Sequence, residues 1–275
     1  MGRRRSSAVK KLFAWVRRQS IKVKSFLGVT SVISALVTLK LLVKDDDNFF
    51  IASEAVHFLG IIVLIYKLTI QKTCSGLSLK SQELTAMFLA VRLCCNFIME
   101  GDIHTVLDFA TLVSTLWVIY TIRFKLKSTY IEELDNMPIY YLVVPCAILA
   151  VIVHPCTYQA RISRIFWAFC VYLESIAVLP QLRMMQSAKT IEPFTAHYVF
   201  ALGVARFLNC AHWLIQVYDT AGMYLFMGGS GGYLWLPMVI VSEIVQTLIL
   251  ADFCFYYIKS VIMNGGLLLS RPLPV

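Results

Sequence analysis

Several ionisable side chains lie inside apolar segments of this sequence, where a charge is costly, and four of them could form one site. They are His57, Arg92, Glu174 and Arg206. On insertion scales, a charged side chain near the centre of a bilayer costs about 2.5–3.5 kcal/mol. A polar cavity that binds an ion, a proton or a ligand offsets this cost, so we expect the apolar segments to surround such a cavity.

Arg92 and Arg206 have the chemistry of an anion site. Arg92 lies about nine residues into its apolar segment, which corresponds to a depth of roughly 14 Å in a hydrocarbon core about 30 Å thick. A guanidinium group stays charged and holds a carboxylate through two parallel hydrogen bonds. Two arginines that face one cavity therefore predict an anion site. The alternative is that each pairs with a carboxylate such as Asp108 or Glu174 and only fixes packing.

His57 and Glu174 have the chemistry of a proton-operated latch. A buried imidazole beside a carboxylate changes its charge near physiological pH. The alternative for His57 is a hydrogen-bonded core histidine. Trp167 supplies an aromatic wall or cation-π face if it lines the cavity, and is otherwise a packing residue. Asp252 and Glu243 lie in the last apolar segment, and the residues alone assign them no role.

The composition is that of a protein that spans a membrane several times. Of 275 residues, 59% are hydrophobic and 15% are charged, which is too apolar for a soluble domain of this size. The net charge is +9, but nine of the 25 Lys and Arg residues lie between Arg3 and Lys24. This basic segment favours membrane lipid as a partner and gives no reason to expect nucleic acid.

We predict eight membrane spans, at residues 26–43, 51–70, 83–99, 104–122, 139–156, 165–182, 194–217 and 233–258. The connections after the second, fourth and sixth of these spans are basic. The connections after the third, fifth and seventh spans hold only Arg161 and Arg164. By the positive-inside rule, the basic connections are cytosolic.

The last seven spans contain an internal repeat. A shift of 114 residues aligns Ala90-Val91-Arg92 with Val204-Ala205-Arg206 and keeps the direction of the spans. The predicted fold is therefore an all-α membrane bundle of two parallel three-helix repeats and a connector helix. Transporters with parallel repeats place their site between the repeats, near the middle of the membrane.

Neither a metal site nor an enzyme active site is expected. The eight cysteines lie mostly in apolar segments and have no Cys-x-x-Cys spacing, which argues against a disulfide framework or a metal site. The glycine run at 228–232 follows no strand and precedes no Lys-Ser pair, so it is not a phosphate-binding loop. Without a pairing of nucleophile and base, we expect no catalytic residues and no cofactor.

Four stretches of the sequence resemble one family of receptors. They are HFLGIIVLIYKLTIQKTCSGLSLKSQ, VYLESIAVLPQL, HYVFALGVAR and VQTLILADF. They resemble the receptors that retrieve lumenal proteins ending in Lys-Asp-Glu-Leu or His-Asp-Glu-Leu, and the likeness runs from about residue 51 to the C-terminus. It implies a PQ-loop or SWEET-like seven-helix domain at 51–260, after a basic N-terminal extension at 1–50 and before a cytosolic tail at 261–275.

This resemblance also implies a cellular role. Such a receptor is a multi-pass protein of the endoplasmic reticulum and Golgi membranes. It binds the C-terminal peptide in the acidified Golgi, travels back with the vesicle coat machinery and releases the peptide at neutral pH. Asp252 matches an acidic residue that the family uses in trafficking.

The resemblance gives the buried charges specific roles. Arg92 matches the clamp for the peptide's terminal carboxylate, and Arg206 matches a second arginine of the charged cavity. His57 and Glu174 fall on the proton-sensing pair, and Trp167 on a tryptophan that lines the ligand site.

The sequence departs from the family at nine positions of the ligand site. Two family arginines and three family acids are among the residues replaced, so side-chain charges of the tetrapeptide lose their partners. The replacements are Phe50, Leu93, Cys95, Arg164, Ala205, Asn209, His212, Gln216 and Leu236. The leading hypothesis is therefore a retrieval receptor, and an altered C-terminal signal is one form of it. The alternatives are a PQ-loop transporter of a small anion or sugar, and a trafficking relative that has lost its ligand.

Overall fold

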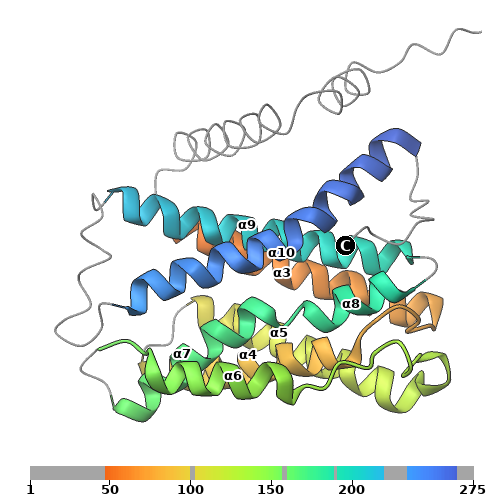
Figure 1. Ribbon diagram of the computed structural model, residues 1–275. Coiled ribbons are helices and arrows are strands. Elements are labelled where there is room, and N and C mark those ends of the chain that lie inside the picture. The colour runs from red at the N-terminus through yellow and green to blue at the C-terminus, as the bar shows by residue number, and fades with distance from the viewer. Residues whose placement is uncertain (1–46, 100–102, 157–159, 189–190, 220–233, 265–275) are drawn as a thin grey trace, which may run out of the picture.

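The protein forms a bundle of helices (Figure 1). The computed structural model describes residues 47–99, 103–156, 160–188, 191–219 and 234–264, and no strand occurs in these ranges. The predicted span at 26–43, most of the N-terminal extension, the glycine run and residues 265–275 lie outside them.

The helices follow the predicted spans closely. The α-helices are α3 (Asp47–Tyr66), α4 (Leu79–Met99), α5 (Ile103–Tyr120), α6 (Tyr140–Ile152), α7 (Arg161–Ile176), α8 (Leu179–Ser187), α9 (Pro193–Asp219) and α10 (Trp235–Asn264). Short π-helical turns, η1 (Lys67–Gln71) and η2 (Thr121–Lys125), extend α3 and α5, and a 3-10 turn, η3 (Lys127–Thr129), follows.

Five helical segments are long and apolar enough to cross a membrane. They are Phe49–Gln71, Thr105–Lys125, Arg161–Ser187, Pro193–Asp219 and Trp235–Ser260. The helix α4 has 21 residues but carries charges, and α6 is a shorter apolar helix. Large apolar side chains such as Leu59, Phe109 and Ile148 are exposed on the outside of the bundle. These features define a multi-helix membrane protein, whose described residues form seven helical segments when α7 and α8 are counted as one.

The segment predicted as one span at 165–182 is divided into two helices. The helix α7 ends at Ile176, and α8 begins at Leu179 with Pro180 in its first turn. Proline lacks the N–H that an interior helical position donates, but it fits the first turn of a new helix. The last helix also continues to Asn264 instead of ending at residue 258.

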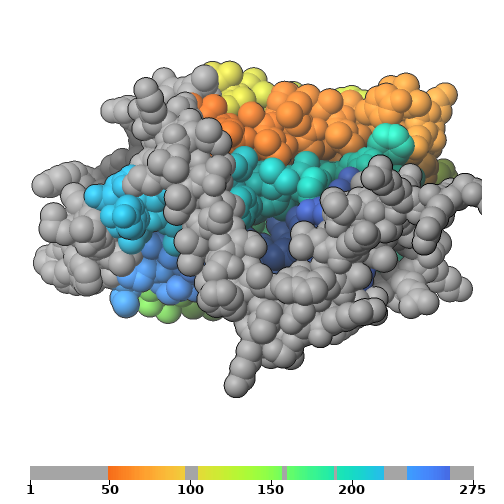
Figure 2. Space-filling view, turned by 90° about the horizontal axis from the view of Figure 1, so that it is seen from above, coloured from red at the N-terminus to blue at the C-terminus, as the bar shows by residue number. Residues whose placement is uncertain are grey.

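Six of the helices form a closed ring. The helix α3 packs against α9, α9 against α10, and α10 against α7; α7 packs against α4, α4 against α5, and α5 returns to α3. The helix α6 packs on α7. Figure 2 shows α3, α9 and α10 side by side on one face of the molecule. The ring brings one face of each helix toward a common interior.

The basic connections predicted to be cytosolic meet at one end of this ring. Gln181, next to Pro180, accepts a hydrogen bond from the N–H of Ser78 at 2.8 Å and donates one to the carbonyl of Gly76 at 2.9 Å. The buried carboxylate of Asp135 accepts from the hydroxyl of Ser78 at 2.8 Å and from that of Tyr130 at 2.7 Å. These bonds tie the α3–α4 and α5–α6 connections to the start of α8.

Tyr130 remains a hydrogen-bond donor at this end of the bundle. Burial raises the pKa of its phenol, and the bond to Asp135 raises that pKa further, to a value well above the usual range. The phenol is therefore protonated over the physiological pH range, and the contact between the two connections persists.

Lys67 is buried, although the sequence suggested only a charge at the edge of a basic connection. It has no exposed surface. Its ammonium group pairs with Glu192 and donates to the Ser75 carbonyl and the Thr195 hydroxyl, both at 2.8 Å. A buried ammonium group requires such partners, and here they join the end of α3 to the start of α9.

Candidate functional site

Glu174 lies between the two arginines that the sequence singled out. Its Oε1 accepts a hydrogen bond from Arg206 Nη1 at 2.5 Å, and its Oε2 accepts one from Arg92 Nη1 at 3.0 Å. The three side chains come from α7, α9 and α4 and are nearly buried, with exposed fractions of 10–11%. The structure therefore places a carboxylate between two guanidinium groups in the interior of the ring.

Arg92 has a second carboxylate partner on its other side. Its Nε donates to Asp108 Oδ2 at 2.8 Å, and its Nη2 pairs with Asp108 Oδ1. Asn96 Nδ2 also donates to Asp108, at 3.4 Å. The bidentate pair fixes the plane of the guanidinium group and ties α4 to α5, while Glu174 ties it to α7.

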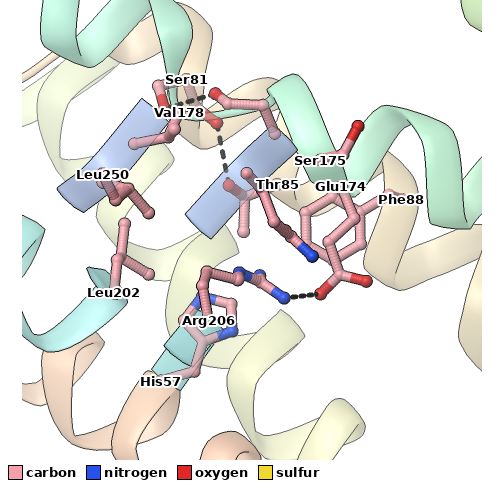
Figure 3. A pocket seen from close by; sticks show the side chains of 12 residues that line it. His57, Ser81, Thr85, Phe88, Glu174, Ser175, Val178, Leu202, Arg206 and Leu250 are labelled. Atoms are coloured by element: carbon pink, nitrogen blue, oxygen red, sulfur yellow. Dashed lines mark hydrogen bonds and ion pairs between the residues drawn. The ribbon is translucent and has the colours of Figure 1, made fainter. Parts of the chain in front are cut away.

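A small cavity lies beside the arginine–glutamate pair (Figure 3). Its lining includes His57 from α3, Glu174 from α7 and Arg206 from α9. In Figure 3 the imidazole of His57 lies next to the Arg206 side chain, and the ion pair of Arg206 with Glu174 forms one wall. The cavity thus presents a titratable ring, a cation and an anion within one buried space.

Hydroxyl groups from α4 form another side of the cavity. Ser81 Oγ donates to the carbonyl of Ala177 at 2.7 Å, and Thr85 Oγ1 donates to the carbonyl of Ser81 at 3.0 Å. Residues 81, 85 and 88 recur at intervals of four and three, which places them on one helix face. This spacing is visible in the sequence, but it did not enter the prediction of the site.

The cavity brings together some of the predicted site residues but not all of them. His57, Glu174 and Arg206 line it, and Arg92 joins them through Glu174. The pairing of arginine with Asp108 and Glu174, foreseen as the packing alternative, is present in the structure.

Two predicted residues lie apart from the cavity lining. Trp167 is two helical turns before Glu174 on α7, partly buried and packed in an apolar cluster with Tyr172 and Trp235. Asp252 is exposed on α10, so it does not share the cavity with the arginines.

Several departures from the family pattern have packing roles. The ring of Phe50 contacts that of His212, with centroids 5.7 Å apart. Cys95 is buried with its Sγ 3.9 Å from the Ser163 carbonyl, and Arg164 donates to the carbonyl of Pro155 at 3.4 Å. These contacts show how three of the residues that depart from the family pattern are held in this chain.

The described cysteines and acids form no inorganic site. All eight cysteines are free thiols, and within the described ranges no cluster of three His, Cys, Asp or Glu residues has the arrangement of a metal site. The site chemistry is therefore that of buried ion pairs and hydrogen bonds.

The fold and the site define a class: a multi-helix membrane protein with a charged cavity enclosed by a ring of helices. Comparison with known proteins identifies the family. The family model of the ER lumen protein retaining receptor matches residues 73–216. The chain belongs to this family.

Individual relatives extend the match beyond that region. The ER lumen protein-retaining receptor erd-2.2 of Caenorhabditis elegans is 34% identical over 217 residues, which cover 78% of this chain and 95% of the relative. ER lumen protein-retaining receptor 3 of Mus musculus is 34% identical over 230 residues, covering 82% and 99%. The Entamoeba histolytica receptor is 32% identical over 213 residues, covering 77% and 93%.

Family membership settles several expectations drawn from the sequence. The resemblance to retrieval receptors is confirmed, as is the assignment to a multi-pass protein of the endoplasmic reticulum and Golgi membranes. The family consists of receptors and not of enzymes, in agreement with the sequence.

Proposed function

We propose that this protein is a membrane receptor for C-terminal retrieval signals similar to Lys-Asp-Glu-Leu or His-Asp-Glu-Leu, and that it returns lumenal proteins from the Golgi to the endoplasmic reticulum in a pH-dependent way. The observation that carries the proposal is the position of Glu174, whose carboxylate is held between Arg92 and Arg206 in a buried cavity. A site that holds one carboxylate in this manner has the chemistry to hold another, the terminal carboxylate of a peptide.

The pH dependence follows from competition for Arg206. At neutral pH the imidazole of His57 is uncharged, and Glu174 pairs with Arg206 across the cavity. At acidic pH the His57 imidazolium attracts Glu174, which leaves Arg206 free to bind the peptide carboxylate together with Arg92. Peptide binding is then favoured in acid, and loss of the His57 proton returns Glu174 to Arg206 and releases the peptide.

We also propose the finer architecture of two parallel three-helix repeats. The order of packing supports it, because α5 lies between α3 and α4 in the first triplet and α10 lies between α7 and α9 in the second. The contact of α3 with α9 then mirrors that of α7 with α4. In this arrangement Arg92 and Arg206 occupy equivalent positions, α6 is the connector, and residues 26–43 form an additional span.

The remaining partners follow from the same proposal. Vesicle coat machinery acts at the cytosolic end, where the basic connections meet, and membrane lipid is the partner of the basic segment between Arg3 and Lys24. Asp252, exposed on α10, contributes to trafficking and not to ligand binding.

One observation favours a second candidate function. Both arginines already have carboxylate partners within the protein, as expected for a relative that keeps the fold and has lost peptide binding. In that case cellular function survives replacement of Arg206, whereas a receptor loses function.

The test is a titration of labelled Lys-Asp-Glu-Leu and His-Asp-Glu-Leu peptides onto purified protein at about pH 5.5 and about pH 7.4, on either side of the usual histidine transition. The proposal expects saturable binding that is at least tenfold tighter at the lower pH. Absence of binding at both pH values contradicts it and favours the second candidate, or a small-molecule transporter if substrate flux occurs in proteoliposomes.

A further inference from the structure

Gln246 brings a hydrogen-bond acceptor to the cavity that the mechanism above does not use. The residue lies on α10, lines the cavity and is 2% exposed. Its amide oxygen, Oε1, is buried and has no hydrogen-bond partner in the described part of the chain. Buried polar atoms are almost always paired, because burial removes the water that would otherwise bind them. The oxygen therefore indicates a donor that enters the cavity with a ligand.

A neighbouring acid fixes the orientation of this amide. Gln246 Nε2 donates to Glu243 Oε2 at 2.5 Å, and Asn209 of α9 forms a second hydrogen bond with the same carboxylate. A carboxylate accepts hydrogen bonds and donates none, so the nitrogen of the Gln246 amide faces Glu243. The amide oxygen points away from Glu243 and stays available as an acceptor.

The turn of α10 that carries Gln246 packs against the turn of α9 that carries Arg206. Thr247, the next residue on α10, donates from its hydroxyl to the backbone carbonyl of Arg206 at 3.4 Å. The side chains of Gln246 and Arg206 line the same cavity. This cavity therefore combines a guanidinium group, which donates to a carboxylate, with a neutral oxygen that accepts from an N–H group.

We propose that Gln246 Oε1 accepts a hydrogen bond from the backbone N–H of the last residue of the bound peptide. The inference rests on the proposed function and adds to it a ligand-binding residue on α10. The last residue of a peptide carries its N–H and its carboxylate on one Cα atom, so a carboxylate bound at Arg206 keeps the N–H close to the same wall. The contact recognises the main chain, and it is compatible with a terminal leucine.

The experiment replaces this one N–H of the ligand by oxygen. Lys-Asp-Glu-Leu is compared with an ester analogue, in which the last residue is the α-hydroxy acid of leucine and the terminal carboxylate is kept. Labelled forms of both are titrated onto the full-length protein at about pH 5.5, where the receptor is expected to bind. The ester should bind about tenfold more weakly, because it cannot donate and leaves the buried acceptor unpaired.

Two controls show whether the loss depends on the proposed acceptor. Methionine is similar in length to glutamine but is only a weak acceptor, so the two peptides should differ by less than about twofold on Gln246→Met. Gln186→Met, at an exposed position of α8, should keep the full difference. An ester placed at the preceding peptide bond should have the same effect on the unmodified protein and on Gln246→Met.

The outcomes separate this inference from the function on which it rests. Equal affinities of the amide and ester peptides for the unmodified protein overturn the Gln246 contact, as does an ester loss of undiminished size on Gln246→Met. Either result leaves the receptor proposal intact. If Gln246→Met does not fold, the comparison on the unmodified protein decides the inference. Failure of the amide peptide to bind contradicts both proposals.

Discussion

Glu174 Oε1 accepts a hydrogen bond from Arg206 Nη1 at 2.5 Å, across the wall of a cavity that also contains His57. The arginine is thus occupied by an internal carboxylate, which a ligand carboxylate must displace in the proposed mechanism. This competition makes the internal pair a determinant of both affinity and pH dependence, and it leads to the first two predictions.

Replacement of Glu174 by glutamine should make ligand binding tighter at neutral pH. The amide is neutral, so it competes less well for the two guanidinium groups that Glu174 now bridges. We expect the dissociation constant at about pH 7.4 to approach the value at about pH 5.5, because the acid-dependent release of Arg206 is no longer needed. Equilibrium titration at the two pH values measures this. A loss of binding at both pH values in a folded variant would contradict the competition mechanism.

Replacement of His57 by asparagine should also abolish the pH dependence, but by weakening binding at acidic pH instead of tightening it at neutral pH. Without an imidazolium to attract Glu174, the carboxylate stays on Arg206 at either pH. We expect the affinity at acidic pH to fall to the neutral-pH level, at least tenfold weaker. His197→Asn is the matched control, since His197 lies outside the cavity lining and contacts Tyr257; it should retain the acid preference.

The buried Lys67 should be a stability determinant without a role in ligand binding. Lys67→Met leaves Glu192 without its ammonium partner and removes the bonds to Ser75 and Thr195. Hydrogen bonds to a charged group contribute about 1.5–3 kcal/mol, so the thermal midpoint in detergent should fall by several degrees. Lys127→Met, at an exposed position, should have no measurable effect. Equal midpoints for the two variants would show that the buried network is not stabilising.

Gly203 permits the close approach of α9 to α10. A Cβ at this position would clash with Cys254 Sγ, whereas it would lie 3.7 Å from the Cβ of Leu250. Gly203→Ala should therefore destabilise the protein by about 1–3 kcal/mol, the usual cost of overpacking. Adding Cys254→Ala removes the clashing sulfur and should restore most of the lost stability, as measured by thermal unfolding of the single and double variants. Additive losses would place the clash elsewhere.

The apolar spans and the buried charges could be predicted because each depends on local sequence. The length of an apolar run shows whether it can cross a bilayer, and a charged residue inside such a run is visible directly in the sequence. The break before Pro180 was also visible in principle, although its effect on the span at 165–182 was not predicted.

The partners of the buried groups could be named only as alternatives and not assigned, because packing between distant segments selects them. Arg92 pairs with Asp108, 16 residues away, and with Glu174, 82 residues away. The sequence gives no reason to prefer one of these carboxylates over the other as the partner of Arg92. Lys67 illustrates the same limit, since its burial depends on Glu192 and Thr195 at the start of a helix from the other half of the chain.

The most direct test of the central claim compares one peptide with a free C-terminal carboxylate and the same peptide with a C-terminal amide, at about pH 5.5. Loss of charged hydrogen bonds worth about 1.5–3 kcal/mol predicts that amidation weakens binding by roughly 10- to 100-fold. Equal affinities for the two peptides would contradict the claim that Arg92 and Arg206 form a site for a ligand carboxylate.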